Sequence, residues 1–313
     1  MKKLSRRLVT SIFAIIVGIS GCGKDSDSSA YSISFREFPI SEHSDTWSRF
    51  TEFDTNGILL VNYDILYGNG LGKQFNPLTT SQLALANYNE YIKNKQNKYL
   101  NYFLILSDNL HKKITSISDD NYGFFYAFAY PRYNLESPWQ SGLANSTALS
   151  VLLRSYSITK SENTKKLIIN LKNNLLSSTE TIGVLANTPD GGVWIEEYPS
   201  TPSSYVLNGF LFSIISLREY LNIFPQDENV KSFYEKLLLS LKTDFHYYDT
   251  GNWLLYDRYE RSPVNAHYMK FQAVLLNEIF ILTKDNFSLE KSQLIEKYRK
   301  AGNPYNPNDK SDQ

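Results

Sequence analysis

Apolar residues recur along most of the chain at the three- and four-residue spacing of amphipathic helices. Four segments share one plan, in which a first amphipathic helix, a short turn rich in Lys, Asn and Asp, and a second amphipathic helix follow one another. The residue just before each turn recurs at intervals of about sixty-odd residues, as stacked α/α hairpins require. These residues are Tyr88, Tyr156, Tyr220 and Phe280.

The two helices of each hairpin differ in how far their apolar surface extends. First arms are apolar on more than one side, most clearly in "VLNGFLFSIISL" (206–217), whereas second arms carry their lysines on one face. This difference predicts inner and outer helices of a curved array. The sequence therefore predicts a mainly α fold, an incomplete α/α toroid of about four helical hairpins over residues 71–301. A plain helical bundle stays open as the alternative.

Shorter segments flank this array. "FREFPI" (35–40) and "FDTNGILLVNYDI" (53–65) are rich in strand-forming residues, and a turn is expected at Thr55 to Gly57. They predict a small N-terminal β extension over residues 35–70. Residues 302–313 are read as a polar tail.

The N-terminus has the pattern of an export signal. Cationic "MKKLSRR" precedes the apolar run "LVTSIFAIIVGIS", which is too short for a membrane span, so residues 1–21 are expected to be a signal peptide. The run ends in "ISGC", which resembles the lipobox of bacterial lipoproteins and predicts lipidation of Cys22. Residues 22–34, which begin with Cys22, are expected to form a polar tether. We expect a bacterial membrane-anchored lipoprotein on the periplasmic or outer-membrane face; an uncleaved anchor or plain secretion is the alternative.

The amino-acid composition limits the classes of ligand that the protein is expected to bind. Lys plus Arg equals Asp plus Glu, at 32 each, so no global field attracts nucleic acid, and a local cluster must hold any anion. Tyrosine is abundant at 23 residues and histidine scarce at 4. Such a surplus suits carbohydrate contact and argues against a zinc site, so neither a metal nor a cofactor is expected.

The loops that look least like generic helix all precede an inner helix. In an array of equivalent hairpins, segments at one phase of the repeat lie at one end of the array. Inner-helix N-termini point to the same end, and their partial positive charge favours an anionic ligand such as a carboxylated sugar. The four loops are residues 72–80, 129–142, 193–204 and 256–268.

The third loop contains "EEYPSTPSS" (196–204). Thr201 and Pro202 are a good N-cap and first-turn pair and predict the start of a helix. Glu197 and Tyr198 then stand at the entrance of that helix. Glutamates near an N-terminus also stabilise the helix dipole, which is the structural alternative to a chemical role.

"EEYPSTPSSYVLNGF" resembles the signature of the D-glucuronyl C5-epimerase family, whose members convert glucuronate to iduronate within heparan-type polysaccharides. Further segments appear in the order of the family, from about residue 53 to the C-terminal helix. They are "FDTNGILLVNYD", "FNPLTTSQLALANYNEY", "YPRYNLESPWQSGLA", "LLRSYSITK", "YDTGNWLLYDR" and "HYMKFQAVLLNEIFILTKD". The resemblance implies an incomplete α/α toroid with a substrate cleft at one end. A homodimer stays open.

Inversion at C5 removes a proton next to a carboxylate and returns one to the opposite face, so the site must stabilise an enolate-like intermediate. The resemblance implies acid/base tyrosines at Tyr198, Tyr256 and Tyr268, with Glu197 as an active-site carboxylate. A tyrosine base would need a nearby cation or strong donor, because its free pKa is about 10. The expected partner is an anionic glucuronate-containing, heparosan-like polysaccharide.

Four more residues are candidates for substrate binding. Arg132 and Arg258 are the cations best placed to pair with the uronate carboxylate, because a guanidinium matches a carboxylate in two-pronged geometry. Asn208 is a candidate carboxylate ligand, and Trp139 a surface for sugar stacking. The alternatives are structural: the two arginines could be ordinary surface residues, Asn208 could make an inner polar contact, and Trp139 could be a core tryptophan.

The chain departs from the family pattern near the last inner helix. Members commonly read "YHxxH" where Met269 and Gln272 stand here, and "GMAQGQ" is replaced by "GLANST" (142–147). His267 is a candidate replacement for a lost histidine. These departures keep open a non-catalytic glycan-binding lipoprotein. A uronate polysaccharide lyase also stays open, because α/α toroids with Tyr, Asn and Arg can abstract the same proton and then eliminate.

Overall fold

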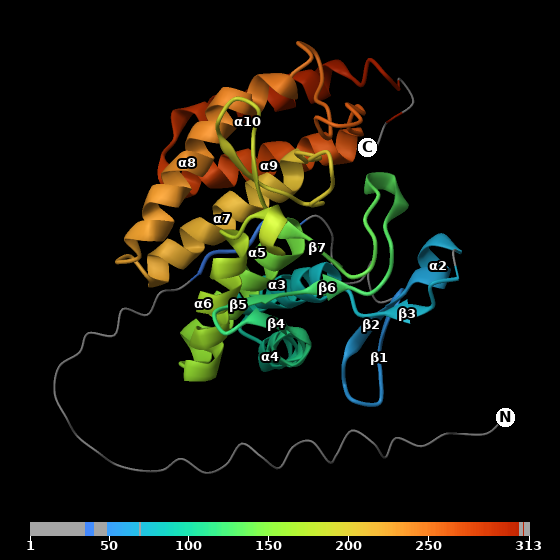
Figure 1. The fold of residues 1–313 in the computed structure, drawn as a ribbon, viewed down its shortest axis with the longest axis vertical. Coiled ribbons are helices and arrows are strands. Elements are labelled where there is room, and N and C mark those ends of the chain that lie inside the picture. Colours follow the sequence, from blue (N-terminus) through green and yellow to red (C-terminus); the bar gives the residue numbers. More distant parts are fainter. Residues whose placement is uncertain (1–34, 41–48, 69, 307–308, 310–313) are drawn as a thin grey trace. The chain divides into compact units, whose positions relative to one another are not determined.

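Four helical hairpins follow one another in the computed structural model, which describes residues 35–40, 49–68, 70–306 and 309 (Figure 1). The inner helices are α3 (Pro77–Asn94), α5 (Gly142–Thr159), α7 (Leu207–Ile223) and α9 (Ala266–Thr283). The outer helices are α4 (Asn97–Lys113), α6 (Glu162–Leu175), α8 (Glu228–Asp244) and α10 (Asn286–Ala301). Inner helices pack on one another in the order α3, α5, α7, α9. The repeat of α/α hairpins predicted from the sequence is confirmed.

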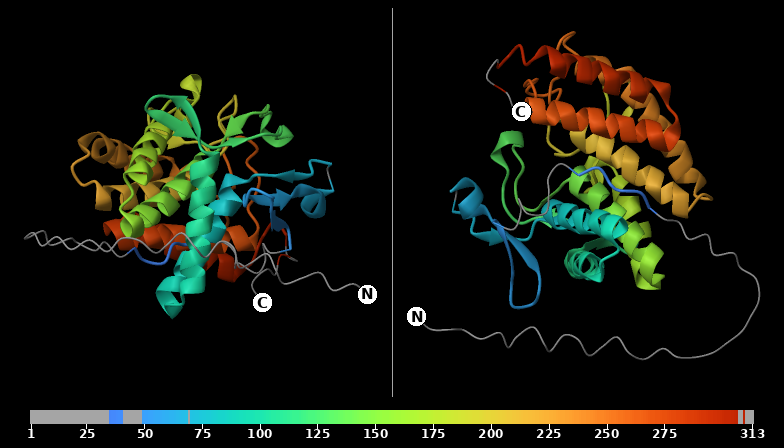
Figure 2. Two further views of the ribbon diagram at one scale, coloured as in Figure 1. Left: turned by 90° about the horizontal axis from the view of Figure 1, so that it is seen from below. Right: turned by 180° about the vertical axis from the view of Figure 1, so that it is seen from behind.

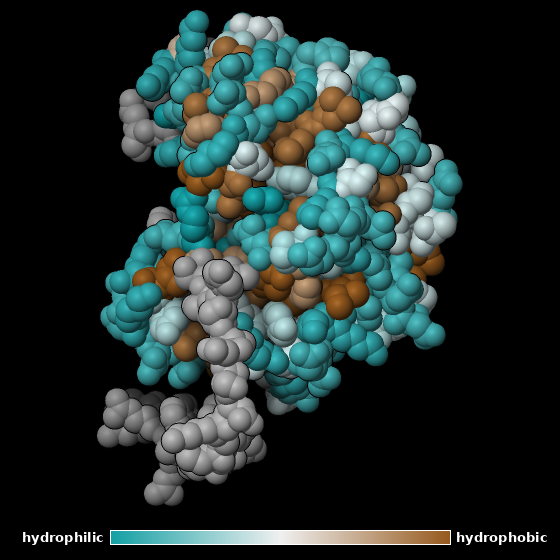
Figure 3. Space-filling model, turned by 90° about the vertical axis from the view of Figure 1, so that its left-hand side faces the viewer, coloured by the Kyte–Doolittle hydropathy of each residue, from teal (hydrophilic) through white to brown (hydrophobic). Residues whose placement is uncertain are grey.

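Inner and outer helices differ in burial as the sequence predicts. Every residue of α5 from Gly142 to Ser155 is buried, whereas α10 buries only Ser288, Ser292 and Ile295. Each fully buried Leu, Ile or Phe of the inner helices stabilises the fold by roughly 1.5–3 kcal/mol. In Figure 2 the hairpins can be traced by colour along the chain, from α3 and α4 to α9 and α10. The face in Figure 3 is largely hydrophilic, with hydrophobic patches between hydrophilic ones.

Three inner helices end at a lysine in the left-handed conformation. Lys95, Lys160 and Lys284 have φ of 56°, 54° and 63°. The backbone N–H of each donates to the carbonyl four residues earlier, which closes the last turn. An L-residue costs about 1–2 kcal/mol in this conformation, so the packing of the hairpins must outweigh it.

A small sheet precedes the array, as predicted. Its strands β1 (Thr51–Phe53), β2 (Leu59–Asn62) and β3 (Lys73–Gln74) are antiparallel in the order β1-β2-β3. The short helix α2 (Tyr63–Tyr67) follows β2 directly and lies beside the sheet (Figure 1). Sequence patterns predicted the sheet but not α2.

Residues 35–40 form no strand, contrary to the interpretation of "FREFPI". Phe35 and Phe38 are buried instead. The Asn89 side chain of α3 accepts from the Phe38 N–H and donates to its carbonyl, both at 2.9 Å. The Asn89 side chain therefore pairs with the Phe38 backbone groups that a neighbouring strand would otherwise have paired with.

Three two-stranded sheets occupy the connections between hairpins. They are β4 (Thr115–Ser118) with β5 (Asn121–Gly123), β6 (Phe125–Tyr126) with β7 (Trp139–Gln140), and β8 (Leu185–Asn187) with β9 (Val193–Ile195). Single 3-10 turns are η1 (Pro131–Tyr133), η2 (Thr179–Thr181) and η3 (Phe245–Tyr247). Strand β7 directly precedes α5, and β9 precedes the loop before α7. Their pairing therefore fixes the position of the segments that precede these helices.

The β1–β2 hairpin is docked on α4 by one buried side chain. Asn109 accepts from the Leu59 N–H at 2.6 Å and donates to the Gly57 carbonyl at 2.8 Å. We expect Asn109→Ala to lower the free energy of unfolding by about 1–3 kcal/mol, because two buried backbone groups lose their partner. Thermal unfolding and hydrogen exchange at the Leu59 amide measure the effect. Asn101→Ala, an exposed position on the same helix, is the control and should leave both unchanged.

The signal peptide, the lipidated Cys22 and the tether lie outside the described residues and stay predictions. Among the residues that the structure does describe, no helix combines the length and apolar character needed to cross a membrane.

Candidate active site

A cavity of about 640 Å³ opens at the N-terminal ends of the inner helices. All four inner helices contribute, and so do the loops that precede them. Helix residues in the lining include Thr79 and Gln82 of α3, Leu143 of α5, Asn208 and Phe212 of α7, and Tyr268 and Phe271 of α9. Loop residues in the lining include Tyr126, Phe128, Tyr130, Trp139, Glu197, Tyr198 and Tyr256. The prediction that these loops gather at one end of the array is confirmed.

The segment after β9 passes between the first turns of two inner helices. The Glu196 carbonyl accepts from the N–H of Gly142, the first residue of α5, at 2.8 Å. The Glu197 carboxylate accepts through Oε2 from the N–H of Gly209, in the first turn of α7, at 3.1 Å. Adjacent glutamates thus occupy unpaired donors of two neighbouring helices, which fixes Glu197 at the mouth of α7.

The start of α7 corrects a prediction. The helix begins at Leu207 after Val206, which makes no side-chain cap bond, and Thr201 and Pro202 lie in the exposed loop before it. Glu197 takes the role of the cap from outside the helix. Gly209 permits this approach, because a Cβ there would lie 2.6 Å from the Glu197 Cβ.

Two of the predicted acid/base tyrosines contact the Glu197 carboxylate, and the third lies next to one of them. The Tyr256 hydroxyl donates to Glu197 Oε1 at 3.3 Å, and the Tyr198 hydroxyl also hydrogen-bonds this carboxylate. The ring of Tyr268 lies edge-on to that of Tyr256, with 5.7 Å between centroids. Glu197 is buried, whereas the Tyr268 side chain is 40% exposed.

Burial separates the proton affinities of these groups. It raises the pKa of Glu197 to about 7, against opposing hydrogen bonds from Tyr198, Tyr256 and Gly209 and the field of Arg132. Burial and the nearby Glu197 hold the pKa values of Tyr198 and Tyr256 well above 10. At neutral pH both tyrosines therefore carry their protons, whereas Glu197, with its pKa of about 7, is present in both protonated and ionised forms.

A second layer of aromatic contacts holds Tyr198. Its ring stacks on Tyr133 with 4.5 Å between centroids and an angle of 16°. The Tyr133 hydroxyl donates to the fully buried carboxylate of Asp257 at 2.9 Å. Arg132 binds Glu260 through Nε and Nη2 at 2.9 and 2.7 Å, and its guanidinium lies 5.2 Å from the Tyr256 ring centre. Arg132 thus lies beside the cluster but in an ion pair.

Asn208 and Trp139 both line the cavity, in different states. Asn208 is 4% exposed, and its Oδ1 has no hydrogen-bond partner. A buried acceptor without a partner is costly, so this atom is suited to a sugar hydroxyl; a carboxylate would require the amide to turn by half a rotation. The Trp139 ring stacks with Tyr126 at 4.3 Å, and its Nε1–H donates to the Phe128 carbonyl. Trp139 therefore has the contacts of a core tryptophan at the cavity wall.

Arg258 is not among the residues that line this cavity. Its guanidinium pairs with Asp244 at 3.1 Å and lies 3.8 Å from the Tyr247 ring centre. These contacts indicate a structural role away from the cavity, although the Arg258 side chain is only 11% exposed and so is not the surface arginine of the alternative.

The family departures at Met269 and Gln272 are outside the cavity lining. Both side chains are fully buried, and neither lines the cavity, whereas His267, Tyr268 and Phe271 of the same helix do. The sequence-based expectation is that these substitutions lie in or beside the cleft, and both residues are on a helix that borders the cavity without lining it. Helical periodicity explains the difference, because these two positions share the inward face of α9.

Glu196 is held differently from Glu197. Its carboxylate accepts from Ser204 Oγ at 2.7 Å and from the Tyr205 N–H, and it does not line the cavity. Burial raises its pKa to about 8, from 4.5 in an exposed chain. Because the folded state binds this proton more tightly, the stabilisation is full below about pH 4.5 and is lost as pH rises through about 8.

We therefore expect Glu196→Gln to flatten the pH dependence of stability, because its amide has no proton to lose. The thermal midpoint of the wild type should fall more between about pH 5 and about pH 8 than that of the variant. Unfolding followed by circular dichroism measures both. Equal falls in the two proteins would contradict the assignment.

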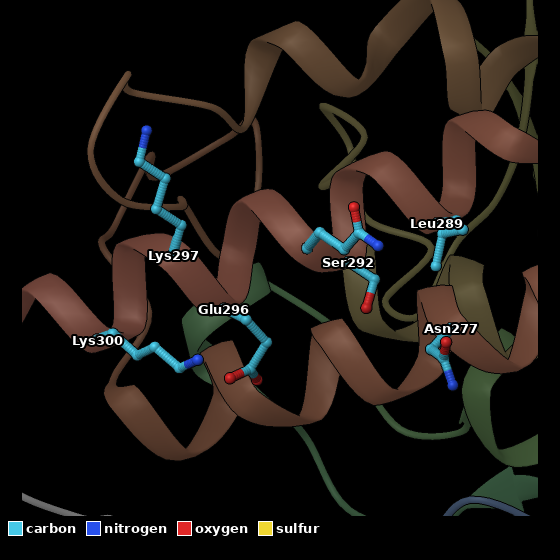
Figure 4. Close-up of a pocket in the computed structure, with 7 residues that line it drawn as sticks. Asn277, Leu289, Ser292, Glu296, Lys297 and Lys300 are labelled. Carbon is cyan, nitrogen blue, oxygen red and sulfur yellow. The ribbon is translucent and has the colours of Figure 1, made fainter.

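A second hollow, of about 540 Å³, lies between α9 and α10 (Figure 4). Its lining is Asn277, Leu289, Ser292, Gln293, Glu296, Lys297 and Lys300. Its lining has no aromatic residue and includes none of the loops that precede the inner helices, so the cavity at the inner-helix ends is the candidate active site. In the described part of the chain, no group of three or more His, Cys, Asp or Glu side chains is placed to hold a metal ion.

The sequence did not single out several residues of the site. Tyr130, Tyr133 and Asp257 hold the acid/base cluster, and Tyr63 and Tyr67 form another cavity wall. The aromatic content of loop 129–142 was the available signal for the first two tyrosines. Nothing local marks Asp257, whose partner Tyr133 is 124 positions away.

Known structures share this architecture. Cellobiose 2-epimerase from Spirochaeta thermophila superposes with a TM-score of 0.51 and 13% identity, covering 73% of this chain and 60% of that one. The GH76 α-mannanase from Bacteroides thetaiotaomicron superposes with a TM-score of 0.55 and 12% identity, covering 81% and 64%. The fold is therefore an α/α toroid, as the hairpin repeat predicts.

Sequence comparison defines the family. The profile described as "D-glucuronyl C5-epimerase C-terminus" matches residues 118–297. The D-glucuronyl C5-epimerase of Caenorhabditis elegans is 34% identical over 139 residues, which are 38% of this chain and 21% of that protein. An uncharacterized protein of Methanocaldococcus jannaschii is 25% identical over 272 residues, 82% of this chain and 87% of that protein. The chain belongs to the D-glucuronyl C5-epimerase C-terminal domain family.

Proposed function

We propose that this protein inverts C5 of D-glucuronate to L-iduronate within a heparosan-like polysaccharide. The observation that carries the proposal is the convergence of Glu197, Tyr198, Tyr256 and Tyr268 in one cavity lined by the unpartnered amide oxygen of Asn208. Family membership supports the same reaction class.

Because the cluster is buried, we assign the roles differently from the sequence-based expectation of tyrosine bases. Glu197 takes the C5 proton, because its pKa of about 7 places a carboxylate in the cavity at neutral pH. The C5–H bond breaks, and its electron pair spreads into the uronate carboxylate as an enediolate. Hydroxyl donors at Tyr198 and Tyr256 and the nearby charge of Arg132 stabilise the added negative charge.

Tyr268 completes the inversion. Its ring lies 5.7 Å from that of Tyr256 and it also lines the cavity, and we assign its hydroxyl as the donor on the opposite face of the sugar. It gives its proton to C5, which forms the new C–H bond, and the resulting phenolate regains a proton from water. Glu197 releases its proton to water, and the site returns to its starting state.

The test is incubation of the chain from Lys24 onward with unsulfated heparosan in heavy water. The expected result is deuterium at C5 and new iduronate signals by NMR, with chain length unchanged. Cleavage with an ultraviolet-absorbing unsaturated uronate would assign a lyase. Absence of C5 exchange on any glucuronan would leave glycan binding as the function and reject the epimerase.

A further inference from the structure

The cavity extends beyond the acid/base cluster to a wall on the N-terminal extension. We call the residues of β2, α2 and the following turn that line the cavity the α2 wall. They are Val61, Tyr63, Leu66, Tyr67 and Leu71. Tyr67 is 70% exposed although it lines the cavity, so its ring is open to a ligand.

The α2 wall is a built structure. Asn62 caps α2 by accepting from the Asp64 and Ile65 N–H groups, and Tyr63 accepts from Asn76 Nδ2 at 2.7 Å. The Tyr63 ring lies 4.8 Å from that of Phe128 and 6.0 Å from that of Tyr67. Tyr67 is therefore the outer member of a row of aromatic rings whose inner members are fixed.

The charge of the lining restricts the ligand. Among the described residues that line the cavity, none is Lys or Arg, Glu197 is the carboxylate, and His267 is the histidine. A sulfate buried against such a surface would lose its hydration without gaining a cation. A neutral sugar ring has an apolar C–H face, and an aromatic side chain offers it a large rigid contact.

We propose that the α2 wall, with Tyr67 as its exposed ring, binds an uncharged sugar residue adjacent to the reacting glucuronate, so that the site selects unsulfated chains. The occupant follows from continuity, because the wall and the acid/base cluster line one cavity and a glycosidic bond holds the neighbouring ring within one sugar of the reacting carbon. This inference rests on the proposed function for the identity of the reacting ring.

The test measures binding apart from turnover. Calorimetric titration with an unsulfated glucuronate-N-acetylglucosamine hexasaccharide should give a Kd about tenfold higher for Tyr67→Ala than for the wild type, which corresponds to about 1.4 kcal/mol. Tyr67→Trp should retain the wild-type Kd, because it keeps an aromatic face. The matched control is Ile65→Ala, which removes a 60% exposed side chain of the same helix that does not line the cavity.

Two further ligands test separately whether Tyr67 contacts the neighbouring sugar ring and whether the site selects against sulfate. Methyl β-glucuronide lacks the neighbouring ring, so its Kd should be the same for Tyr67→Ala and the wild type. The N-sulfated hexasaccharide should bind the wild type at least tenfold more weakly than the unsulfated one. Equal Kd values for Tyr67→Ala and Ile65→Ala, or equal binding of the two hexasaccharides, would overturn the inference. Normal binding without C5 exchange would instead reject the proposed function and leave the wall intact.

Discussion

Replacing Glu197 by Gln is expected to lower the rate of C5 exchange between about 100-fold and about 10,000-fold. The amide keeps the shape of the side chain and can still accept from the Gly209 N–H, so α7 keeps its cap. It cannot accept a proton at neutral pH. The measurement is deuterium incorporation at C5 by NMR, with wild type and variant at equal concentrations of folded protein.

The pH profile supplies a second readout for Glu197. Because burial raises its pKa to about 7, the wild-type rate should rise as pH increases through about 7, where the carboxylate becomes the major form. Glu196→Gln is the matched control, since Glu196 is as buried but does not line the cavity. Wild-type exchange by Glu197→Gln, or a larger loss in Glu196→Gln, would exclude Glu197 as the base.

Replacing Tyr268 by Phe is expected to separate exchange from inversion. Glu197 can still remove the C5 proton and return a solvent-derived one to the same face, so deuterated glucuronate should form. Iduronate should fall by about 100-fold or more, because the donor on the opposite face is lost. NMR of the product in heavy water distinguishes the two sugars.

Tyr259→Phe provides the control for Tyr268→Phe. Tyr259 is 43% exposed in the preceding loop and does not line the cavity, so its hydroxyl should not affect either product. A Tyr268→Phe variant that produces iduronate and deuterated glucuronate in the wild-type ratio would remove Tyr268 from the mechanism. Loss of exchange together with inversion would assign the base role to Tyr268.

The hairpin repeat and the position of the site were predictable because both follow from local patterns. Helical periodicity identified inner helices such as α7, and the phase of the repeat placed Glu197 and Tyr198 at one end of them. Burial on all sides of α5 follows from the same rule. Such patterns can be read from the sequence because the polarity of each helical residue depends on whether its face of the helix is buried or exposed.

Contacts between distant residues explain what the sequence could not predict. Thr201 and Pro202 carry a strong local helix-start signal, but Glu197 caps α7 from outside and moves its start to Leu207. Arg132 is held by Glu260, 128 positions away, a pairing that no local spacing encodes. The proposal of a glutamate base in place of tyrosine bases likewise depends on burial, which exists only in the folded chain.

The close approach of Gly209 to Glu197 constrains how this protein can be engineered. Glycine is disfavoured inside helices by about 1 kcal/mol relative to alanine, so a stability-guided redesign of α7 would replace it early. The added methyl group would lie 2.6 Å from the Glu197 Cβ and displace the side chain that the mechanism requires. A sequence library that keeps Glu197 must therefore also keep Gly209, so the two positions cannot be varied independently.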